Sequence, residues 1–174
     1  MKIHAFIQSR LNSNRLPCKA LLPLGGHSIL SNCIQNTKKS KIIEQTILLT
    51  SSEYSDNLIY SEGVKNDINV YRGSLNNVFD RFYSASIKFN SDIIVRLTAD
   101  NPFINSLYID SMINEFFKNN VDYHSNKTQR KAPIGLDVEI FKASLLKYKK
   151  DNLTDMASEH VTYDFYNNNN DLKI

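Results

Sequence analysis

Short apolar runs alternate with amphipathic segments along this chain, and the alternation predicts an α/β fold. Residues 2–8, 46–50 and 92–97 are apolar runs of strand length, each followed by polar residues. Residues 29–37 and 109–117 instead place apolar side chains three and four positions apart, the spacing of a helix with one buried face. Because strands and helices take turns, we expect a mostly parallel sheet covered by helices.

Weaker segments between these elements complete the pattern. They predict a helix over 51–65 that Gly63 ends or loosens, a strand over 68–71, a helix from about Ser74 and a strand over 121–126. The order of elements therefore continues the alternation through most of the chain.

Residues 135–141 form the last predicted strand. Its apolar residues alternate with Asp137 and Glu139. This period of two predicts a half-buried strand that presents both carboxylates on one face.

Polar residues mark the predicted helix ends. Ser28 and Asn105 precede two of the helices and can act as N-caps. Lys38, Lys39 and Lys41 follow the first helix, where cations offset the helix dipole. A nucleic-acid patch is the alternative explanation for these lysines.

Composition fits one globular domain. The 174 residues are 41% hydrophobic and 22% charged, which excludes collagen-like and wholly disordered proteins. The net charge of +3 is small for a dedicated nucleic-acid binder. Cys18 and Cys33 lack metal-site spacing, and no stretch approaches the ~20 apolar residues of a membrane span. We expect a cytoplasmic protein without a membrane span.

Ligands of parallel α/β sheets gather at the carboxyl ends of the strands. The segments that follow the predicted strands are 8–19, 72–77 and 98–101. The first contains Arg10, Arg15 and Lys19, and three cations beside free backbone groups suit a polyphosphate. A solvated surface loop is the alternative.

Asp100 follows the strand predicted over 92–97 and precedes a proline turn. A carboxylate in that place can coordinate magnesium, which takes one or two carboxylates together with phosphates and water. The alternative is an aspartate that stabilises the turn.

Residues 7–19 read IQSRLNSNRLPCK and resemble a family signature, IQARMGSTRLPGK. The family is that of the cytidylyltransferases related to the spore-coat polysaccharide proteins and to the CMP-sialate and CMP-Kdo synthetases. Further matching segments follow in the family's order: 22–26, 71–74, 78–83, 95–102, 135–141 and 159–162. The resemblance covers most of residues 3–166 and is more specific than one glycine-rich loop.

The resemblance implies a glycosyltransferase-A-like variant of the Rossmann sandwich, forming a single nucleotidyltransferase domain over 1–174. It also implies CTP as donor, Mg²⁺ as cofactor, a surface-glycan precursor as acceptor and pyrophosphate as product. No nucleic-acid or membrane partner is expected, and a homodimer stays open. The alternative is a catalytically impaired CTP-binding protein of the same fold.

Site residues follow from the same matching segments. Arg10, Arg15 and Lys19 would neutralise the triphosphate, and Asp100 would hold magnesium. The residues expected around the nucleotide are Gln8, Ser9, Arg10, Ser13, Arg15, Lys19, Arg72, Gly73, Ser74, Arg81 and Ala99. Arg81 has a second interpretation as a surface ion pair. The residues expected at the acceptor are Asp137, Glu139 and His160, and His160 has an alternative role in packing or capping.

The chain departs from the family pattern at three places. Asn12 and Cys18 replace family glycines. Relatives usually continue beyond the segment matching 165–174 into a strand and helix with a VDTPEDL motif, whose Asp gives a second metal contact. Asp137 and Glu139 could substitute for it, although lining the acceptor pocket or pairing with a cation suits them better. We expect the chain to bind CTP better than it turns CTP over.

Overall fold

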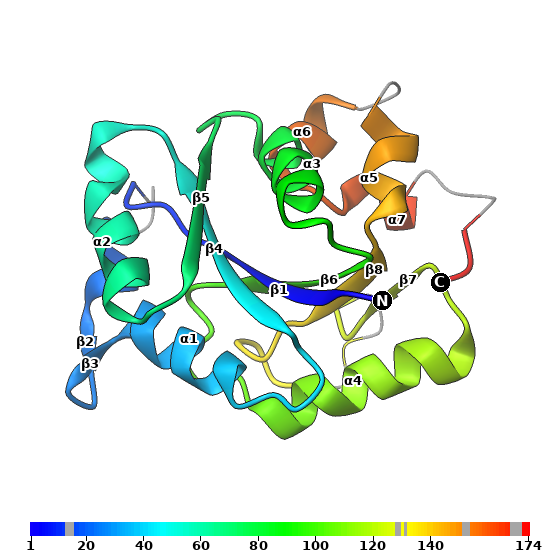
Figure 1. The fold of residues 1–174 in the computed structure, drawn as a ribbon, viewed down its shortest axis with the longest axis horizontal. Coiled ribbons are helices and arrows are strands. Elements are labelled where there is room, and N and C mark those ends of the chain that lie inside the picture. The colour runs from blue at the N-terminus through cyan, green and yellow to red at the C-terminus, as the bar shows by residue number, and fades with distance from the viewer. Residues whose placement is uncertain (13–15, 128–129, 131, 151–153, 168–171) are drawn as a thin grey trace.

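A six-stranded sheet forms the centre of the part of the chain that the structure describes. The structure is a computed structural model that describes residues 1–12, 16–127, 130, 132–150, 154–167 and 172–174. The sheet order is β5-β4-β1-β6-β8-β7 (Figure 1). The strands are β1 (Ile3–Gln8), β4 (Gln45–Ser51), β5 (Asn69–Gly73), β6 (Ile93–Thr98), β7 (Tyr123–Ser125) and β8 (Glu139–Lys142). β5, β4, β1 and β6 are parallel, which confirms the predicted sheet, whereas β8 runs antiparallel to β6 and to β7.

β1 lies between β4 and β6 and is buried on both of its faces. Ala5 and Ile7 pack on one side of the sheet, while Phe6 packs on the other. Burial on two faces explains why β1 is a continuous apolar run rather than an alternating one.

Helices cover both faces of the sheet. α1 (Ile29–Lys38), α2 (Asn57–Lys65) and α4 (Ser106–Asn119) contribute to one apolar core. α3 (Val78–Phe89) and α5 (Ser144–Lys149) pack on the other face, with α6 (Asp155–Glu159) and α7 (Tyr163–Asn167) beside them (Figure 1). A short hairpin, β2 (Pro23–Leu24) and β3 (His27–Ser28), precedes α1. Of the described helices, none is long and apolar enough to cross a membrane.

The predicted caps of two helices are confirmed. The Ser28 hydroxyl accepts a bond of 2.9 Å from the Ser31 N–H, and the Asn105 side chain accepts one of 2.8 Å from the Leu107 N–H. Each side chain satisfies an amide that the first helical turn leaves free.

The prediction for residues 51–65 was wrong in two respects. A 3₁₀ turn over Tyr54–Asp56 delays α2 until Asn57. Gly63 lies inside the helix, which continues to Lys65. A Cβ at this position would stand 2.6 Å from Cγ2 of Val70 and 2.8 Å from Cδ2 of Leu48, both too close. Gly63 therefore allows α2 to pack closely on the sheet.

Two other boundaries also differ from the prediction. α3 begins at Val78 rather than near Ser74, because Asn77 caps it by accepting a 2.8 Å bond from the Asp80 N–H. β8 begins at Glu139, so Asp137 precedes the strand instead of lying in it.

Candidate active site

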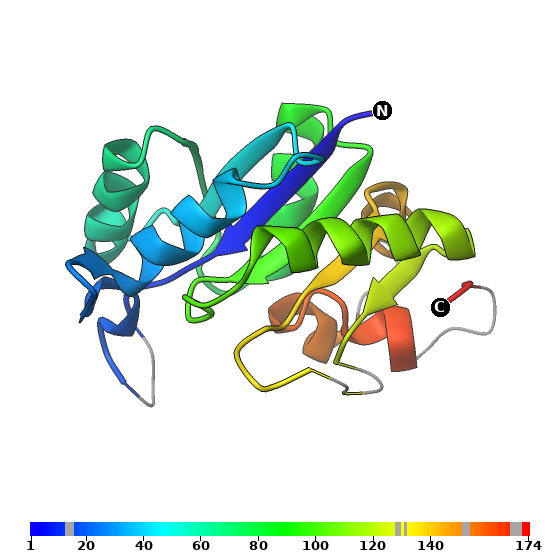
Figure 2. The same ribbon diagram turned by 90° about the horizontal axis from the view of Figure 1, so that it is seen from below.

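The carboxyl ends of the four parallel strands meet at one edge of the sheet. The Ser9 N–H donates to the Leu49 carbonyl and the Ala99 N–H donates to the Gln8 carbonyl, each at 3.0 Å. These bonds join the segment after β1 to β4, and the segment after β6 to β1. Figure 2 shows the loop after β1 and the segments of α6 and α7 on the same lower side, away from the N-terminus.

Lys19 and Asp100 form an ion pair at this edge, with the lysine Nζ donating to the carboxylate. The Lys19 side chain is 28% exposed and that of Asp100 is 40% exposed. Burial by itself would raise the pKa of Asp100, but hydrogen bonds from Lys19 and Thr98 and the lysine charge hold the pKa below its ordinary value. The cation predicted for phosphate and the acid predicted for metal are therefore in contact.

Arg10 lies close to the end of α6. Its guanidinium lies 3.6 Å from the carboxylate of Glu159, and both side chains are partly exposed. Ser13 and Arg15, predicted in the same loop, lie outside the described residues.

Arg72 holds the turn that follows β4. Its three nitrogens donate to the Ser51 carbonyl (2.9 Å), the Asn57 side chain (2.7 Å) and the Glu53 carbonyl (2.8 Å). A planar guanidinium suits such a fixed set of acceptors. In this structure Arg72 builds the frame of the site.

Arg81 is buried, with 1% of its surface exposed, so the interpretation as a surface ion pair was wrong. Its Nη1 donates to the Ser74 carbonyl at 3.2 Å, whereas Nε has no partner among the described residues. Burial lowers the pKa of Arg81 to about 10, against the opposing charge of Asp56. A Cβ at Gly73 would lie 3.2 Å from Cγ of Arg81, so the glycine leaves room for this side chain.

Two hydroxyls at the same edge share this lack of partners. Ser9 Oγ and Thr50 Oγ1 are buried and make no hydrogen bond within the described part of the chain. Ser9 follows β1, and Thr50 lies in the adjacent strand β4, beside Arg72 of β5. Buried polar atoms without partners are uncommon in folded proteins and indicate a place that a ligand or water completes.

Glu139 is the centre of a buried polar network. It pairs with Arg96, accepts bonds from the Tyr123 (2.8 Å) and Thr162 (2.6 Å) hydroxyls, and lies 3.7 Å from Nζ of Lys127. Burial alone would raise the pKa of Glu139, but these cations and donors hold it below its ordinary value. Residues 135–141 were predicted to form a half-buried strand with Asp137 and Glu139 on one face; instead Glu139 is buried and Asp137 precedes the strand. The predicted pairing of Glu139 with a cation is confirmed.

The remaining acceptor residues lie nearer to solvent. Asp137 pairs with Arg130 at 2.9 Å, which confirms its predicted pairing with a cation. His160 is exposed and lies between α6 and α7, and its backbone N–H donates to the Met156 carbonyl at 2.9 Å.

Two buried charged residues of this region were not predicted as site residues. Arg96 donates from Nη2 to the Gln8 side chain at 3.1 Å and so links the first strand to Glu139. A charged residue inside the apolar run 92–97 was the signal for it. Asp56, which is 1% exposed, falls inside the helix predicted over 51–65, so the sequence gives no signal for its role.

A family model for cytidylyltransferases matches residues 4–174. The chain belongs to the cytidylyltransferase family. It is 39% identical over its whole length to the uncharacterized protein MJ1063 of Methanocaldococcus jannaschii, of which it covers 71%. It is 33% identical to the spore coat polysaccharide biosynthesis protein SpsF of Bacillus subtilis, over 90% of this chain and 66% of SpsF.

Other cytidylyltransferases extend these similarities. The 3-deoxy-manno-octulosonate cytidylyltransferase of Chloroherpeton thalassium is 30% identical over 68% of this chain, which spans about half (48%) of that relative. The solved structure of a cytidylyltransferase from Leptospira borgpetersenii has a TM-score of 0.91 and 37% identity, over 97% of this chain and 72% of the other. The match confirms the predicted Rossmann-like nucleotidyltransferase fold.

That Asp100 holds a divalent cation stays a prediction, and the surroundings of Asp100 in this cytidylyltransferase are compatible with it. Asp100 is ionised, half-exposed and placed beside a predicted phosphate ligand, Lys19. The described residues contain no cluster of three or more metal-binding side chains. Such a site fits magnesium, which is commonly held by one or two carboxylates together with substrate phosphates.

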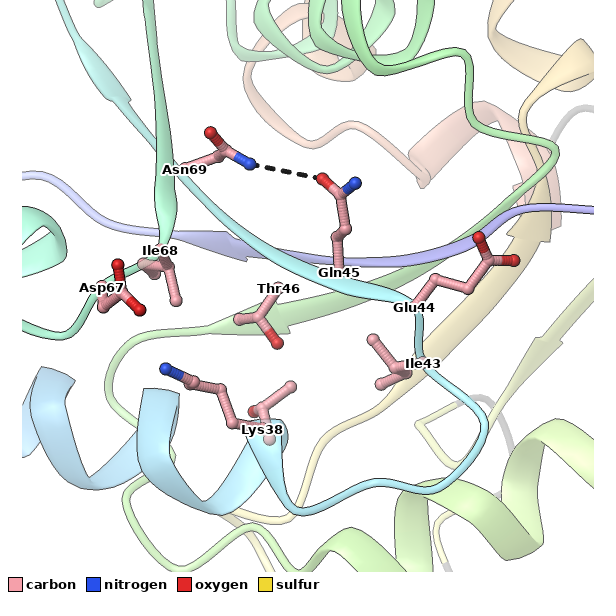
Figure 3. Close-up of a pocket in the computed structure, with 9 residues that line it drawn as sticks. Lys38, Ile43, Glu44, Gln45, Thr46, Asp67, Ile68 and Asn69 are labelled. Atoms are coloured by element: carbon pink, nitrogen blue, oxygen red, sulfur yellow. Dashed lines mark hydrogen bonds between the residues drawn. The ribbon is translucent and has the colours of Figure 1, made fainter.

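Two open pockets of the cytidylyltransferase lie away from this edge. One, of about 250 Å³, is at the amino ends of β4 and β5 and is lined by polar side chains that include Lys38, Glu44 and Asp67 (Figure 3). The other, of about 550 Å³, lies between the β2–β3 hairpin, α1 and α2. Neither is lined by a predicted site residue.

Proposed function

We propose that this cytidylyltransferase transfers CMP from CTP to an oxygen of a surface-glycan precursor. The acceptor oxygen attacks the α-phosphate, the bond between the α- and β-phosphates breaks, and pyrophosphate leaves. The contact between Lys19 and Asp100 carries the proposal, because it brings a phosphate-binding cation and a metal-binding acid together at the ligand-binding edge of the sheet.

Cationic side chains of the protein would bind the triphosphate. Lys19 and Arg10 belong to the loop that follows β1 (residues 9–19, here called the first loop). They would neutralise negative charge that develops on the phosphates. Arg15 and Ser13 are proposed to join them. Asp100 would hold magnesium, which supplies charge neutralisation on the triphosphate.

Arg81 and Ser9 are the proposed contacts of the cytosine ring. The ring nitrogen N3 and the exocyclic O2 of cytosine both accept hydrogen bonds. The buried Nε of Arg81 and the Ser9 hydroxyl are donors without partners at this edge. Arg72, Gly73 and Ser74 would shape the pocket, and the backbone of Gln8 and Ala99 would form its floor.

A sugar acid is the proposed acceptor class. The names of SpsF and of the 3-deoxy-manno-octulosonate cytidylyltransferases refer to polysaccharide and sugar-acid chemistry. Lys127 and Arg130 are partly exposed cations that match a carboxylate. Glu139 and Asp137 would orient these cations, and His160 would face the acceptor from the turn after α6.

The test is pyrophosphate release from CTP and Mg²⁺ with a panel of sugar acids and phosphorylated small molecules. We expect release with one acceptor class, and Asp100→Asn should slow it roughly 100-fold because the amide is a poor ligand for a hard cation. Asp122→Asn is the matched control, since Asp122 pairs with Lys142 at 2.6 Å beside the opposite end of β6. Equal losses in the two variants would contradict the proposal.

A catalytically impaired CTP-binding protein is the second candidate function. It is favoured by the absence of a multi-ligand metal cluster within the described ranges. Saturable CTP binding without pyrophosphate release from any acceptor would support this candidate over the first.

A nucleic-acid-binding function has less support. The lysines at the end of α1 and those of α5 belong to helices on opposite faces of the sheet (Figure 1). They do not form one continuous basic surface, which nucleic-acid binding requires.

A further inference from the structure

The carboxylate of Asp56 bonds to the first loop and not to α2, the helix that Asp56 precedes. Asp56 occupies the N-cap position of α2, but its side chain accepts no bond from that helix. An aspartate in this position ordinarily bonds to the first helical turn. Here Oδ1 accepts a 2.7 Å bond from the Leu11 N–H, and Oδ2 accepts from the N–H (3.1 Å) and the hydroxyl of Ser51.

The backbone of Leu11 also bonds to the other end of the first loop. The Leu11 carbonyl accepts a 3.0 Å bond from the Cys18 N–H, and Lys19 is the next residue. The backbone of Leu11 is therefore held by Asp56 on its N–H and by Cys18 on its carbonyl. These contacts link Asp56 to Cys18, which precedes Lys19, and Lys19 in turn contacts Asp100.

The negative charge of Asp56 also affects the buried Arg81. It opposes the effect of burial, which lowers the pKa of Arg81.

We propose that Asp56 is a positioning residue of the nucleotide site: it fixes the first loop through Leu11 so that Lys19 meets the triphosphate. The inference rests on the proposed function for the identity of the nucleotide. The bonds of Asp56 to the loop do not depend on it, so amide exchange tests the positioning separately from CTP binding.

The primary variant is Asp56→Asn, whose amide keeps the size of the side chain but offers a single acceptor oxygen. Hydrogen exchange at the Cys18 amide should speed up about tenfold as the loop loosens. The Kd for CTP should rise about tenfold by calorimetry. In the double variant with Lys19→Ala, CTP affinity should fall little below that of Lys19→Ala alone, because both residues act through one loop.

Asp110→Asn is the matched control. Like Asp56, Asp110 accepts from a backbone N–H, that of Lys41 at 3.0 Å, and from a hydroxyl, that of Ser40, whereas Asp56 accepts from a second backbone N–H as well. Asp110 lies on α4 beside the loop that precedes β4. It should leave CTP affinity within about twofold of wild type. Ser51→Ala removes a hydroxyl while the Leu11 bond stays, and it should behave in the same way.

Asp56→Glu serves if Asp56→Asn does not fold, because it keeps the charge and both acceptor oxygens while displacing them. The same changes at Cys18 and in CTP affinity are expected, with smaller size. Unchanged affinity in a folded Asp56 variant of a CTP-binding wild type would overturn the role of Asp56. A loss in Ser51→Ala equal to that in Asp56→Asn, or losses that add fully in the double variant, would overturn it as well.

The two proposals can fail separately. Faster exchange at Cys18 in Asp56→Asn, with no CTP binding by the wild type, would support the positioning of the loop and overturn the proposed function. CTP binding by the wild type together with unchanged exchange at Cys18 in the variant would support the function and overturn the positioning.

Discussion

The open pocket at the amino end of the sheet and the predicted site at its carboxyl end differ in how their polar groups are bonded. At the amino end lies an open pocket whose side chains bond to the protein itself: Lys38 donates to the Asn66 carbonyl at 3.0 Å, and Asn69 donates to Gln45 at 3.3 Å (Figure 3). At the carboxyl end, buried atoms of Ser9 and Arg81 have no partner within the described residues.

This difference indicates that a surface pocket is weaker evidence for a ligand site than buried polar atoms without hydrogen-bond partners. An unsatisfied buried donor costs about 1 to 3 kcal/mol, so a folded protein has reason to keep it only where something else completes the bond. A pocket lined by satisfied polar groups has no such requirement. The comparison therefore favours the carboxyl end as the nucleotide site.

Among the effects expected in the protein without nucleotide, the largest concerns metal binding. In the free protein the Lys19 ammonium occupies the Asp100 carboxylate. Lys19→Ala should therefore tighten Mn²⁺ binding roughly tenfold, because it removes a competing and repelling cation. Electron paramagnetic resonance of free Mn²⁺ measures the change. The double variant with Asp100→Asn should lose the gain, and a gain that survives in it would place the metal elsewhere.

A smaller effect concerns the backbone of the first loop. Cys18 has a φ of 59° and replaces a glycine of the family signature. Left-handed backbone is costly for residues with a Cβ, so Cys18→Gly should stabilise the fold by about 0.5 to 1 kcal/mol in urea unfolding. Cys18→Ala keeps the Cβ and should show no comparable gain. Equal stabilisation by both variants would assign the effect to the thiol.

The smallest effect comes from His4 in β1, a buried residue near the amino end of the sheet that also has a ring nitrogen without a partner in the described chain. His4 Nδ1 lies 2.8 Å from the Ser91 hydroxyl, and its buried Nε2 has no described partner. Burial lowers the pKa of His4, and Lys2 adds to this, while Glu44 and Asp92 oppose it. Since the unfolded chain then binds the proton more readily, stability should be full above about pH 6.5 and fall as the pH drops below it.

Urea unfolding between pH 7.5 and 5 measures this slope, and His4→Gln should flatten it. An unchanged slope in the variant would assign the pH dependence to other groups.

The sequence predicted the parts of the fold that depend on local pattern and buried strands. β1, β6 and the capped helices α1 and α4 were found because apolar spacing and cap residues lie within a few positions of each other. The placement of Lys19 and Asp100 at one edge of the sheet also followed, because the carboxyl ends of neighbouring parallel strands share that edge; their direct contact was not predicted.

Features that depend on distant partners were not predictable in the same way. Glu139 alternates with apolar residues like a surface acid, but Arg96, 43 positions earlier, neutralises it inside the fold. Arg72 of β5 and Arg81 of α3 are the same residue type, and only the packing of the fold shows that Arg72 bonds to the turn after β4 while Arg81 is buried. Gly63 suggested a helix end because the sequence does not show that Val70 and Leu48 crowd it.

Calorimetric titration of the wild type, Lys19→Ala and Lys38→Ala with CTP, UTP and ATP tests the central claim most directly. The account predicts that the wild type prefers CTP and that Lys19→Ala weakens CTP binding by about 1.5 to 3 kcal/mol, the worth of a charge-assisted hydrogen bond. Lys38→Ala, at the amino-end pocket, should bind CTP as the wild type does. Equal binding of the three nucleotides, or a loss of CTP affinity in Lys38→Ala but not in Lys19→Ala, would contradict it.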